Sequence, residues 1–156
     1  MRYPWDEFRG KSTVGASVIA YWPGLRRDQM DTMPGFTNDD RAWGNWMAER
    51  EADDDVLNAV KTLKADAILT VKTDGWDDDD VNWVTPEELR ASALRLRAAV
   101  EAQRPEAAVI LASYERNANL EDSVREEFIR DLDDIVSIAK WAEEQGASKM
   151  TLEVNW

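Results

Sequence analysis

The sequence predicts an α/β fold, a mostly parallel or mixed four-stranded sheet with helices packed on it, in the order β-α-β-α-β-α-β. Short apolar segments at 16–22, 66–73, 107–114 and 148–155 are the predicted strands. The stretches between them carry apolar residues at helical spacing, and helical crossovers favour right-handed β-α-β units. The length of 156 residues, without a repeat or a Gly/Ser linker, predicts a single domain, 1–156.

Composition and turn signals define the first two predicted strands. The segment 16–22 is rich in β-branched and aromatic residues and ends at the turn signal Pro23-Gly24. The stretch 23–36 holds two Pro-Gly pairs and no helical stripe, so we expect an irregular surface excursion there. The segment 66–73 leads directly into an acidic loop and is the second predicted strand.

The last two predicted strands differ in their apolar pattern. The segment 107–114 is apolar without alternation, which is typical of a strand covered on both faces. In the segment 148–155, Met150, Leu152 and Val154 alternate with polar residues, the pattern of a strand buried on one face. We therefore expect 107–114 at the centre of the sheet and 148–155 at an edge.

Helices are predicted between these strands. Residues between 39 and 65 fit one bent helix or two abutting helices. The motif Thr85-Pro86-Glu87-Glu88 is a helix start, because it combines an N-cap hydroxyl, a proline at the first helical position and acids in the first turn. The stretch 121–145 is the longest predicted helix, and Phe128, Leu132 and Ile135 belong to its apolar stripe.

The residue types that most enzymes use for nucleophilic and general-base catalysis are missing from this chain. It contains no cysteine and no histidine, so thiolate nucleophiles, imidazole bases and the usual zinc ligands are absent. No serine lies in a Gly-x-Ser-x-Gly motif. We therefore predict that the protein is not an enzyme and has no catalytic residues and no cofactor.

The net charge restricts the class of partner. The chain carries 32 acidic and 19 basic residues, a formal charge of −13, and most of the excess lies at 39–55, 66–88 and 121–134. Such a charge repels nucleic acid and anionic membranes and attracts basic proteins. No stretch reaches the ~20 apolar residues of a membrane span, and the N-terminus lacks a signal-peptide core. We expect a cytoplasmic protein without a direct nucleic-acid or membrane partner.

The segment TDGWDDDDVNW, Thr73–Trp83, places four consecutive aspartates between two tryptophans. Calcium-loop frames that start in this segment put Trp or Val at ligand positions, so we predict no metal site. The aspartates are then either a hydrated charge run or a contact surface for a basic protein. Nearby tryptophans favour the contact surface, because tryptophan often anchors interfaces and acids steer a basic partner. The predicted partner-binding residues are Trp76, Asp77, Asp78, Asp79, Asp80, Trp83, Trp43, Asp39 and Asp40.

These features predict a small acidic protein that binds and inhibits a basic enzyme, in particular a bacterial immunity protein that neutralises its cognate toxin. An acidic domain of helices and parallel strands without its own chemistry is similar in type to barstar-like ribonuclease inhibitors and to immunity proteins of polymorphic toxins. Acidic side chains can replace a substrate's phosphates and pair with catalytic Lys and Arg of the target. Two alternatives stay open, a nucleic-acid mimic directed against a DNA-binding defence protein and an enzyme that uses carboxylate-bound magnesium.

Overall fold

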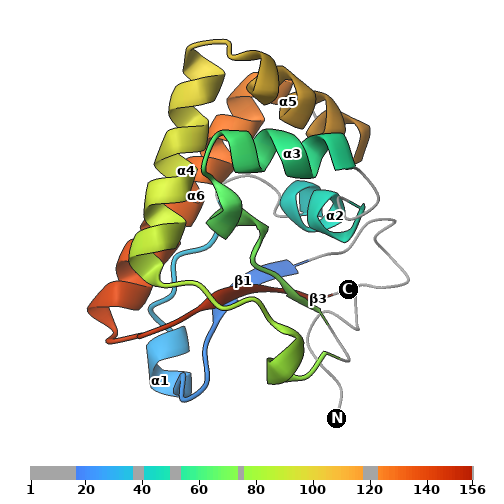
Figure 1. The fold of residues 1–156 in the computed structure, drawn as a ribbon. Helices are drawn as coiled ribbons and strands as arrows, with labels where there is room; N and C mark the ends of the chain where they lie inside the picture. The colour runs from blue at the N-terminus through green and yellow to red at the C-terminus, as the bar shows by residue number, and fades with distance from the viewer. Residues whose placement is uncertain (1–16, 37–40, 50–53, 74–75, 118–122, 156) are drawn as a thin grey trace, which may run out of the picture.

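The computed structural model describes residues 17–36, 41–49, 54–73, 76–117 and 123–155, and it places a layer of helices on one face of a small sheet (Figure 1). Buried apolar side chains from both layers form one continuous cluster. The protein is mostly helical, so the sheet is the minor part of the fold.

The sheet has three strands in the order β1-β3-β2, with β1 at Ser17–Tyr21, β3 at Thr151–Asn155 and β2 at Lys72–Thr73. β1 runs antiparallel to β3, whereas β2 runs parallel to it. The predicted four-stranded sheet with the order β-α-β-α-β-α-β is therefore wrong. The first predicted strand is confirmed, but the C-terminal strand lies at the centre of the sheet instead of at its edge.

Side chains alternate between the two faces of the sheet, as strand geometry requires. The side chains buried on the helix side are Val18, Ala20, Leu152 and Val154. The partly exposed side chains of the opposite face are Ile19, Tyr21 and Glu153. We call this second face the outer face.

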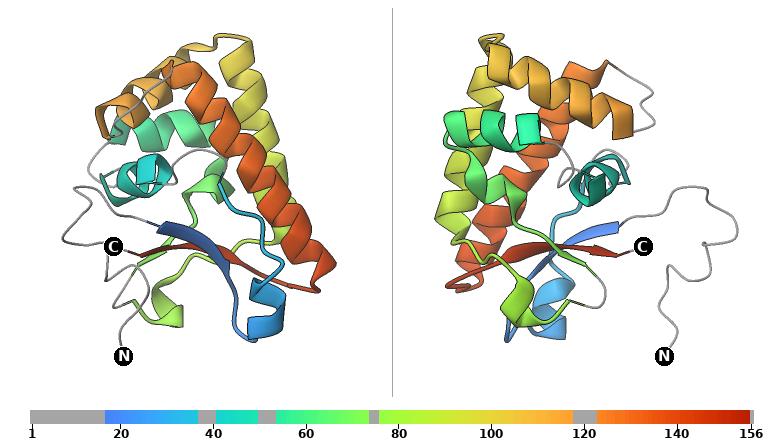
Figure 2. Two further views of the ribbon diagram at one scale, coloured as in Figure 1. Left: turned by 180° about the vertical axis from the view of Figure 1, so that it is seen from behind. Right: turned by 45° about the vertical axis from the view of Figure 1, so that its right-hand side comes forward.

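Helices account for most of the described chain. They are α1 (Arg27–Met30), α2 (Arg41–Glu49), α3 (Asp54–Thr62), α4 (Pro86–Glu101), α5 (Pro105–Asn117) and α6 (Val124–Glu144). The 3₁₀ turns within the described ranges are η3 (Asp66–Leu69) and η4 (Asp78–Asp80). α4 and α6 lie side by side, and α5 packs on α2, α3 and α6 (Figure 2). α1 and η4 lie beyond the sheet, on the side of the outer face (Figure 1).

The segment 107–114, predicted as the central strand, lies within helix α5. Its burial follows a helical period, because Ala107, Ile110 and Tyr114 are buried while Ala108 and Val109 are exposed. Alanine and leucine favour helices, and the preceding Pro105 occupies the first helical position. The unbroken apolar run thus belongs to a helix with one buried face and apolar residues on its exposed side.

The segment 66–73 also differs from its prediction. Its first half forms the 3₁₀ turn η3, and only Lys72–Thr73 pair with β3. Ala67, Ile68 and Leu69 are buried, and η3 packs against α4. The apolar residues of this segment therefore fill the space beneath α4, where a tight turn buries them as well as a strand would.

Two predicted helices are confirmed in detail. The hydroxyl of Thr85 accepts a hydrogen bond from the Glu88 backbone N–H at 3.0 Å, so Thr85 is the N-cap of α4. Phe128, Leu132 and Ile135 of α6 are fully buried, each 0% exposed. The predicted helical region between 39 and 65 contains α2 and α3, and the residues between these two helices lie outside the described ranges.

Truncation of the α6 stripe tests its place in the core. We expect Leu132→Ala to lower the free energy of unfolding by about 2–5 kcal/mol, because it removes transfer energy and leaves a cavity. Lys140→Ala, at an exposed position of the same helix, should change it by less than about 0.5 kcal/mol. Urea denaturation measures both variants. Equal, small changes would show that this stripe lies outside the core.

An exposed position on α5 distinguishes helix from strand. Val109 is 39% exposed, and alanine is the better helix former, so Val109→Ala should raise the free energy of unfolding by roughly 0.5 kcal/mol. In a strand the same change should lower it, because β-branched residues favour strands. The reverse exchange Ala112→Val, also at an exposed position of α5, should have the opposite effect. Urea denaturation measures the sign of the change in the free energy of unfolding for both variants.

Candidate functional site

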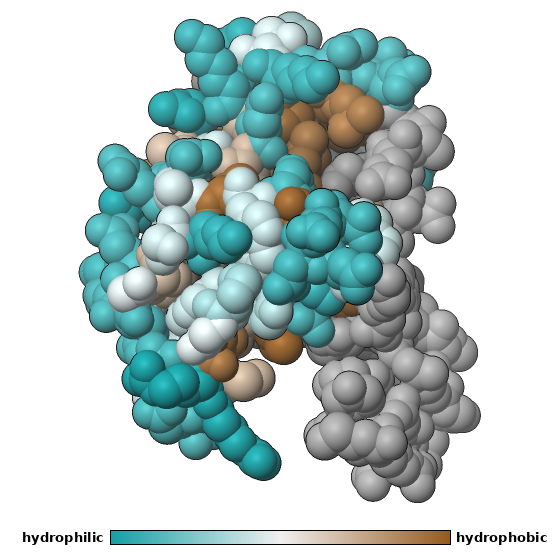
Figure 3. All heavy atoms as spheres, turned by 60° about the horizontal axis from the view of Figure 1, so that its bottom comes forward, coloured by the Kyte–Doolittle hydropathy of each residue, from teal (hydrophilic) through white to brown (hydrophobic). Residues whose placement is uncertain are grey.

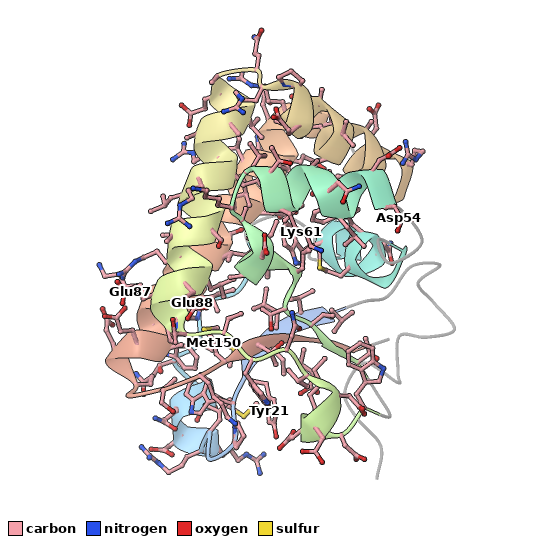
Figure 4. All side chains as sticks on the ribbon, in the orientation of Figure 1. Tyr21, Asp54, Lys61, Glu87, Glu88 and Met150 are labelled. Atoms are coloured by element: carbon pink, nitrogen blue, oxygen red, sulfur yellow. The ribbon has the colours of Figure 1, made fainter. Side chains whose placement is uncertain are left out.

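The outer face of the sheet brings aromatic and charged side chains together. Tyr21 of β1 projects away from the helix layer (Figure 4). Glu153 of β3 and Lys72 of β2 are neighbours in the strand register. Seen from this side, residues of intermediate hydropathy gather in the middle of the face, with hydrophilic residues around them (Figure 3). Such a combination of rings and charges is typical of a surface that binds another molecule.

The acidic turn, which we define as Asp77–Asp80, is closed by its own polar groups. The Asp77 backbone N–H donates to Asp80 Oδ2 at 3.0 Å, and the Asp80 N–H donates to the Asp77 carbonyl oxygen at 2.9 Å. Aspartate side chains that bond to nearby backbone favour turns over regular strands. All four aspartates are exposed to solvent. The turn therefore presents a compact group of carboxylates.

Three hydrogen bonds hold this turn and the residue before it, and two of their donors belong to the sheet. The Tyr21 hydroxyl donates to Asp78 Oδ1 at 3.3 Å, and the Trp83 indole N–H donates to the Asp78 carbonyl oxygen at 3.2 Å. Lys72 Nζ donates to the carbonyl oxygen of Trp76 at 2.9 Å. Because these donors come from β1, β2 and the segment after the turn, the acidic turn is held at several points.

Two rings on this surface each have a lysine ammonium nearby. The Tyr21 and Trp83 ring centroids are 5.9 Å apart, with an angle of 37° between their planes. Lys72 Nζ lies 5.6 Å from the Tyr21 centroid, and Lys149 Nζ lies 4.7 Å from the Trp83 centroid. Both distances are within the range of cation–π attraction. We use the name outer surface for the outer face together with Lys72, the acidic turn, Trp83 and Lys149. This surface carries several carboxylates and two lysine ammonium groups.

The environment of Tyr21 changes its acidity. Burial raises the pKa of the Tyr21 phenol above its ordinary value. The negative charge of Asp78, the hydrogen bond to Asp78 and the charge of Glu153 raise this pKa further. Tyr21 therefore stays protonated at neutral pH and remains a hydrogen-bond donor to the acidic turn.

The structure groups some of the predicted partner-binding residues and separates others. Trp76, Trp83 and the acidic turn lie in one connected region. Trp76 packs against the core cluster and is only partly exposed, so it is less available than the sequence suggested. Asp39 and Asp40 lie outside the described residues.

Trp43, predicted on the contact surface, is fully buried instead, at 0% exposed. Its ring lies 5.1 Å from Trp46 and 5.9 Å from Phe128, in an aromatic cluster beneath the helices. The Trp46 indole N–H donates to Ser113 Oγ at 3.0 Å, which satisfies its polar group. Trp43 and Trp46 lie on the buried, apolar face of α2. The acidic residues near them in the sequence were therefore no sign that the two rings are exposed.

The partner-binding residues predicted from the sequence do not include Tyr21, Lys72, Lys149 or Glu153. Tyr21 and Glu153 could have been found, because their neighbours in the same strands are buried and alternation puts them on the opposite face. Lys72 and Lys149 gave no comparable signal. Their positions depend on the β2–β3 pairing and on the Val84–Met150 bridge, which join distant parts of the chain.

The other described parts of the molecule contain weaker candidates for a functional site. A groove of about 450 Å³ between α3, η3 and α4 is lined by Lys61, Lys64, Asp66, Glu87, Glu88, Arg95 and smaller residues. It is open and holds charges of both signs (Figure 4). The described ranges contain no group of three or more acidic side chains arranged to hold a metal ion. No helix within these ranges is both long and apolar enough to span a membrane.

No protein-family model, no curated protein and no solved structure matches this chain. The candidate function therefore rests on the geometry of the outer surface alone.

The link between Tyr21 and the acidic turn can be tested by titration. We expect Asp78→Asn to lower the pKa of the Tyr21 phenol, because it removes the negative charge nearest to the hydroxyl. The ultraviolet absorbance of phenolate between neutral and alkaline pH measures this change, and Tyr21→Phe identifies the signal. Asp79→Asn is the matched control and should leave the Tyr21 titration closer to that of the parent. Equal titrations in both Asp variants would show that the turn does not contact Tyr21.

Proposed function

We propose that this protein binds a basic partner protein through the outer face of its sheet and thereby inhibits that partner. One observation carries the proposal, the exposed acidic turn beside the partly exposed rings of Tyr21 and Trp83, on the side opposite the main helix layer. Charge complementarity identifies the partner's chemistry, because carboxylates outnumber lysines on this surface and the whole chain carries −13.

Charge and rings have separate roles in such a complex. A net negative field draws a basic protein toward the surface and raises the association rate. Aromatic rings bury a large area on contact, and they supply the interactions that delay dissociation. The acidic turn and the Tyr21–Trp83 pair combine both features within one connected region.

The hydrogen bonds within the surface support a binding role over a simple hydrated run. A flexible acidic loop would lose conformational entropy when a partner ordered it. Here the turn is closed by its own polar groups, Tyr21 and Trp83 donate to Asp78, and Lys72 donates to the preceding Trp76. A surface ordered before binding loses less entropy, which favours affinity.

Inhibition of a basic enzyme is the specific form of binding that we propose, as in an immunity protein that neutralises a toxin inside the producing cell. Enzymes that cleave nucleic acids hold Lys and Arg in their active sites to bind phosphates. A compact group of exposed carboxylates can pair with these side chains and block substrate. A cytoplasmic location belongs to the same proposal.

The experiment begins with the partner. The immobilised protein captures binding proteins from a lysate of its native cell at low and high salt, and each captured protein is purified. The proposal requires a basic protein with an enzymatic activity that falls as this protein is added. Direct binding without any loss of activity would contradict the inhibitory part of the proposal.

Removal of the four charges should slow association with that partner. Changing all four residues of the acidic turn from Asp to Asn removes the steering charge, so we expect a lower association rate and a weaker salt dependence. The matched control removes four exposed acids elsewhere by amide substitution, at Asp66, Glu101, Glu115 and Glu144. Stopped-flow or surface binding kinetics separates the two. An equal decrease in both variants would show that only net charge matters.

Loss of the Trp83 ring should act on dissociation instead. We expect Trp83→Ala to raise the dissociation rate by about thirtyfold, because a central aromatic anchor contributes roughly 2 kcal/mol. Trp83 is a cleaner choice than Trp76, which packs on the core and whose loss would also lower stability. Unchanged dissociation would remove Trp83 from the interface.

A further inference from the structure

One cation on the outer surface has no polar partner among the described residues. Lys149 is exposed, and its ammonium lies 4.7 Å from the Trp83 ring centroid. Within the described ranges no hydrogen bond or ion pair joins it to another residue. Lys72 differs, because it donates to the Trp76 carbonyl oxygen and so helps to fix the turn. Lys149 therefore lies on the ring face without a second attachment to any residue that the structure describes.

The ring that carries Lys149 is fixed from two directions. Its indole N–H donates to the Asp78 carbonyl oxygen, and the Tyr21 ring lies beside it. The Asp78 carboxylate accepts from the Tyr21 hydroxyl, which leaves its second oxygen available as an acceptor. The Trp83 ring and the Asp78 carboxylate thus belong to one group of residues that are joined by hydrogen bonds and ring contact.

We infer that Lys149 occupies, in the free protein, the position that an arginine of the basic partner takes in the complex. This inference rests on the proposed function and names the partner's contact group. Guanidinium stacks on indole rings and forms paired hydrogen bonds with carboxylates, whereas an ammonium does neither as well. Arginine is also more weakly hydrated than lysine, so moving it onto the ring costs less. The released Lys149 ammonium returns to water.

An internal competitor weakens binding of the group that must displace it. Removal of Lys149 should therefore tighten the binding of arginine beyond the effect of one lost charge. The probes are an acetylated, amidated oligoarginine peptide and an oligolysine peptide of equal length. Calorimetric titrations at about 0.15 M ionic strength limit the long-range charge effect.

Lys149→Ala empties the ring face, whereas Lys149→Met removes the charge and keeps a side chain that can cover the ring. We expect Lys149→Ala to bind oligoarginine about two- to fivefold more tightly than the parent. Lys149→Met should give a smaller gain. Lys140→Ala and Lys140→Met, at an exposed position of α6, are the matched controls for charge and should give only a small, equal gain.

Preference for arginine is the second measurement. The parent should bind oligoarginine more tightly than oligolysine, and Trp83→Leu should abolish most of that difference. The melting temperature of each variant checks that its fold is retained. If both Lys149 variants have lower melting temperatures than the parent, their affinities are compared with each other only.

Three outcomes would overturn the inference. They are equal gains from the Lys149 and Lys140 substitutions, equal gains from Lys149→Ala and Lys149→Met, and equal affinity of the parent for the two peptides. Any of these can occur while a basic partner still binds through the acidic turn, in which case the proposed function stands without an arginine on Trp83. Loss of salt-dependent binding to every basic protein would overturn both.

Discussion

The pairing of β3 with strands on both of its sides is the constraint on which the candidate surface depends. β3 joins β1, from the start of the described chain, to β2, which precedes the acidic turn. Thr70 Oγ1 lies 2.8 Å from both the Asn82 carbonyl oxygen and the Thr151 hydroxyl. Since a hydroxyl has one proton, Thr70 donates to Asn82 and accepts from Thr151. Thr70 thus joins the chain before the acidic turn to Asn82 after it, and its buried bond to Thr151 attaches both to the central strand.

Local signals in the sequence predicted the parts of the fold that local interactions decide. The α4 cap depends on Thr85 and the residues directly after it, and the α6 stripe depends on one helix period. The errors occurred where tertiary packing decides. The segment 107–114 is apolar at nearly every position, so its sequence does not show which side chains are buried. Its packing on α2, α3 and α6 buries one face of the helix. In the segment 66–73, burial beneath α4 overrode the strand pattern.

In the candidate surface too, the sequence predicts what local interactions decide and does not predict what tertiary contacts decide. The acidic turn is local, so its exposure and its hydrogen-bonded closure follow from consecutive aspartates. Tyr21 reaches the turn, and Lys149 reaches the Trp83 ring, because β3 and the Val84–Met150 bridge join distant segments. Trp43 shows the converse, since acids near it in sequence suggested exposure while the apolar face of α2 buries it. Sequence proximity of charge and ring is therefore a weak guide, and the shared face is the stronger one.

Two lysines lie on a surface whose carboxylates would otherwise repel one another. Four adjacent carboxylates repel one another, and Glu153 adds to the negative field around Tyr21. Lys72 offsets part of this repulsion while it holds the Trp76 carbonyl, so its removal would disturb the turn. Lys149 lies on the Trp83 ring face, and a partner's cation can replace this cation–π attraction without breaking a hydrogen bond of the described residues. In the proposed exchange, the surface keeps the Lys72 hydrogen bond that orders it and gives up only the Lys149 contact to a partner's cation.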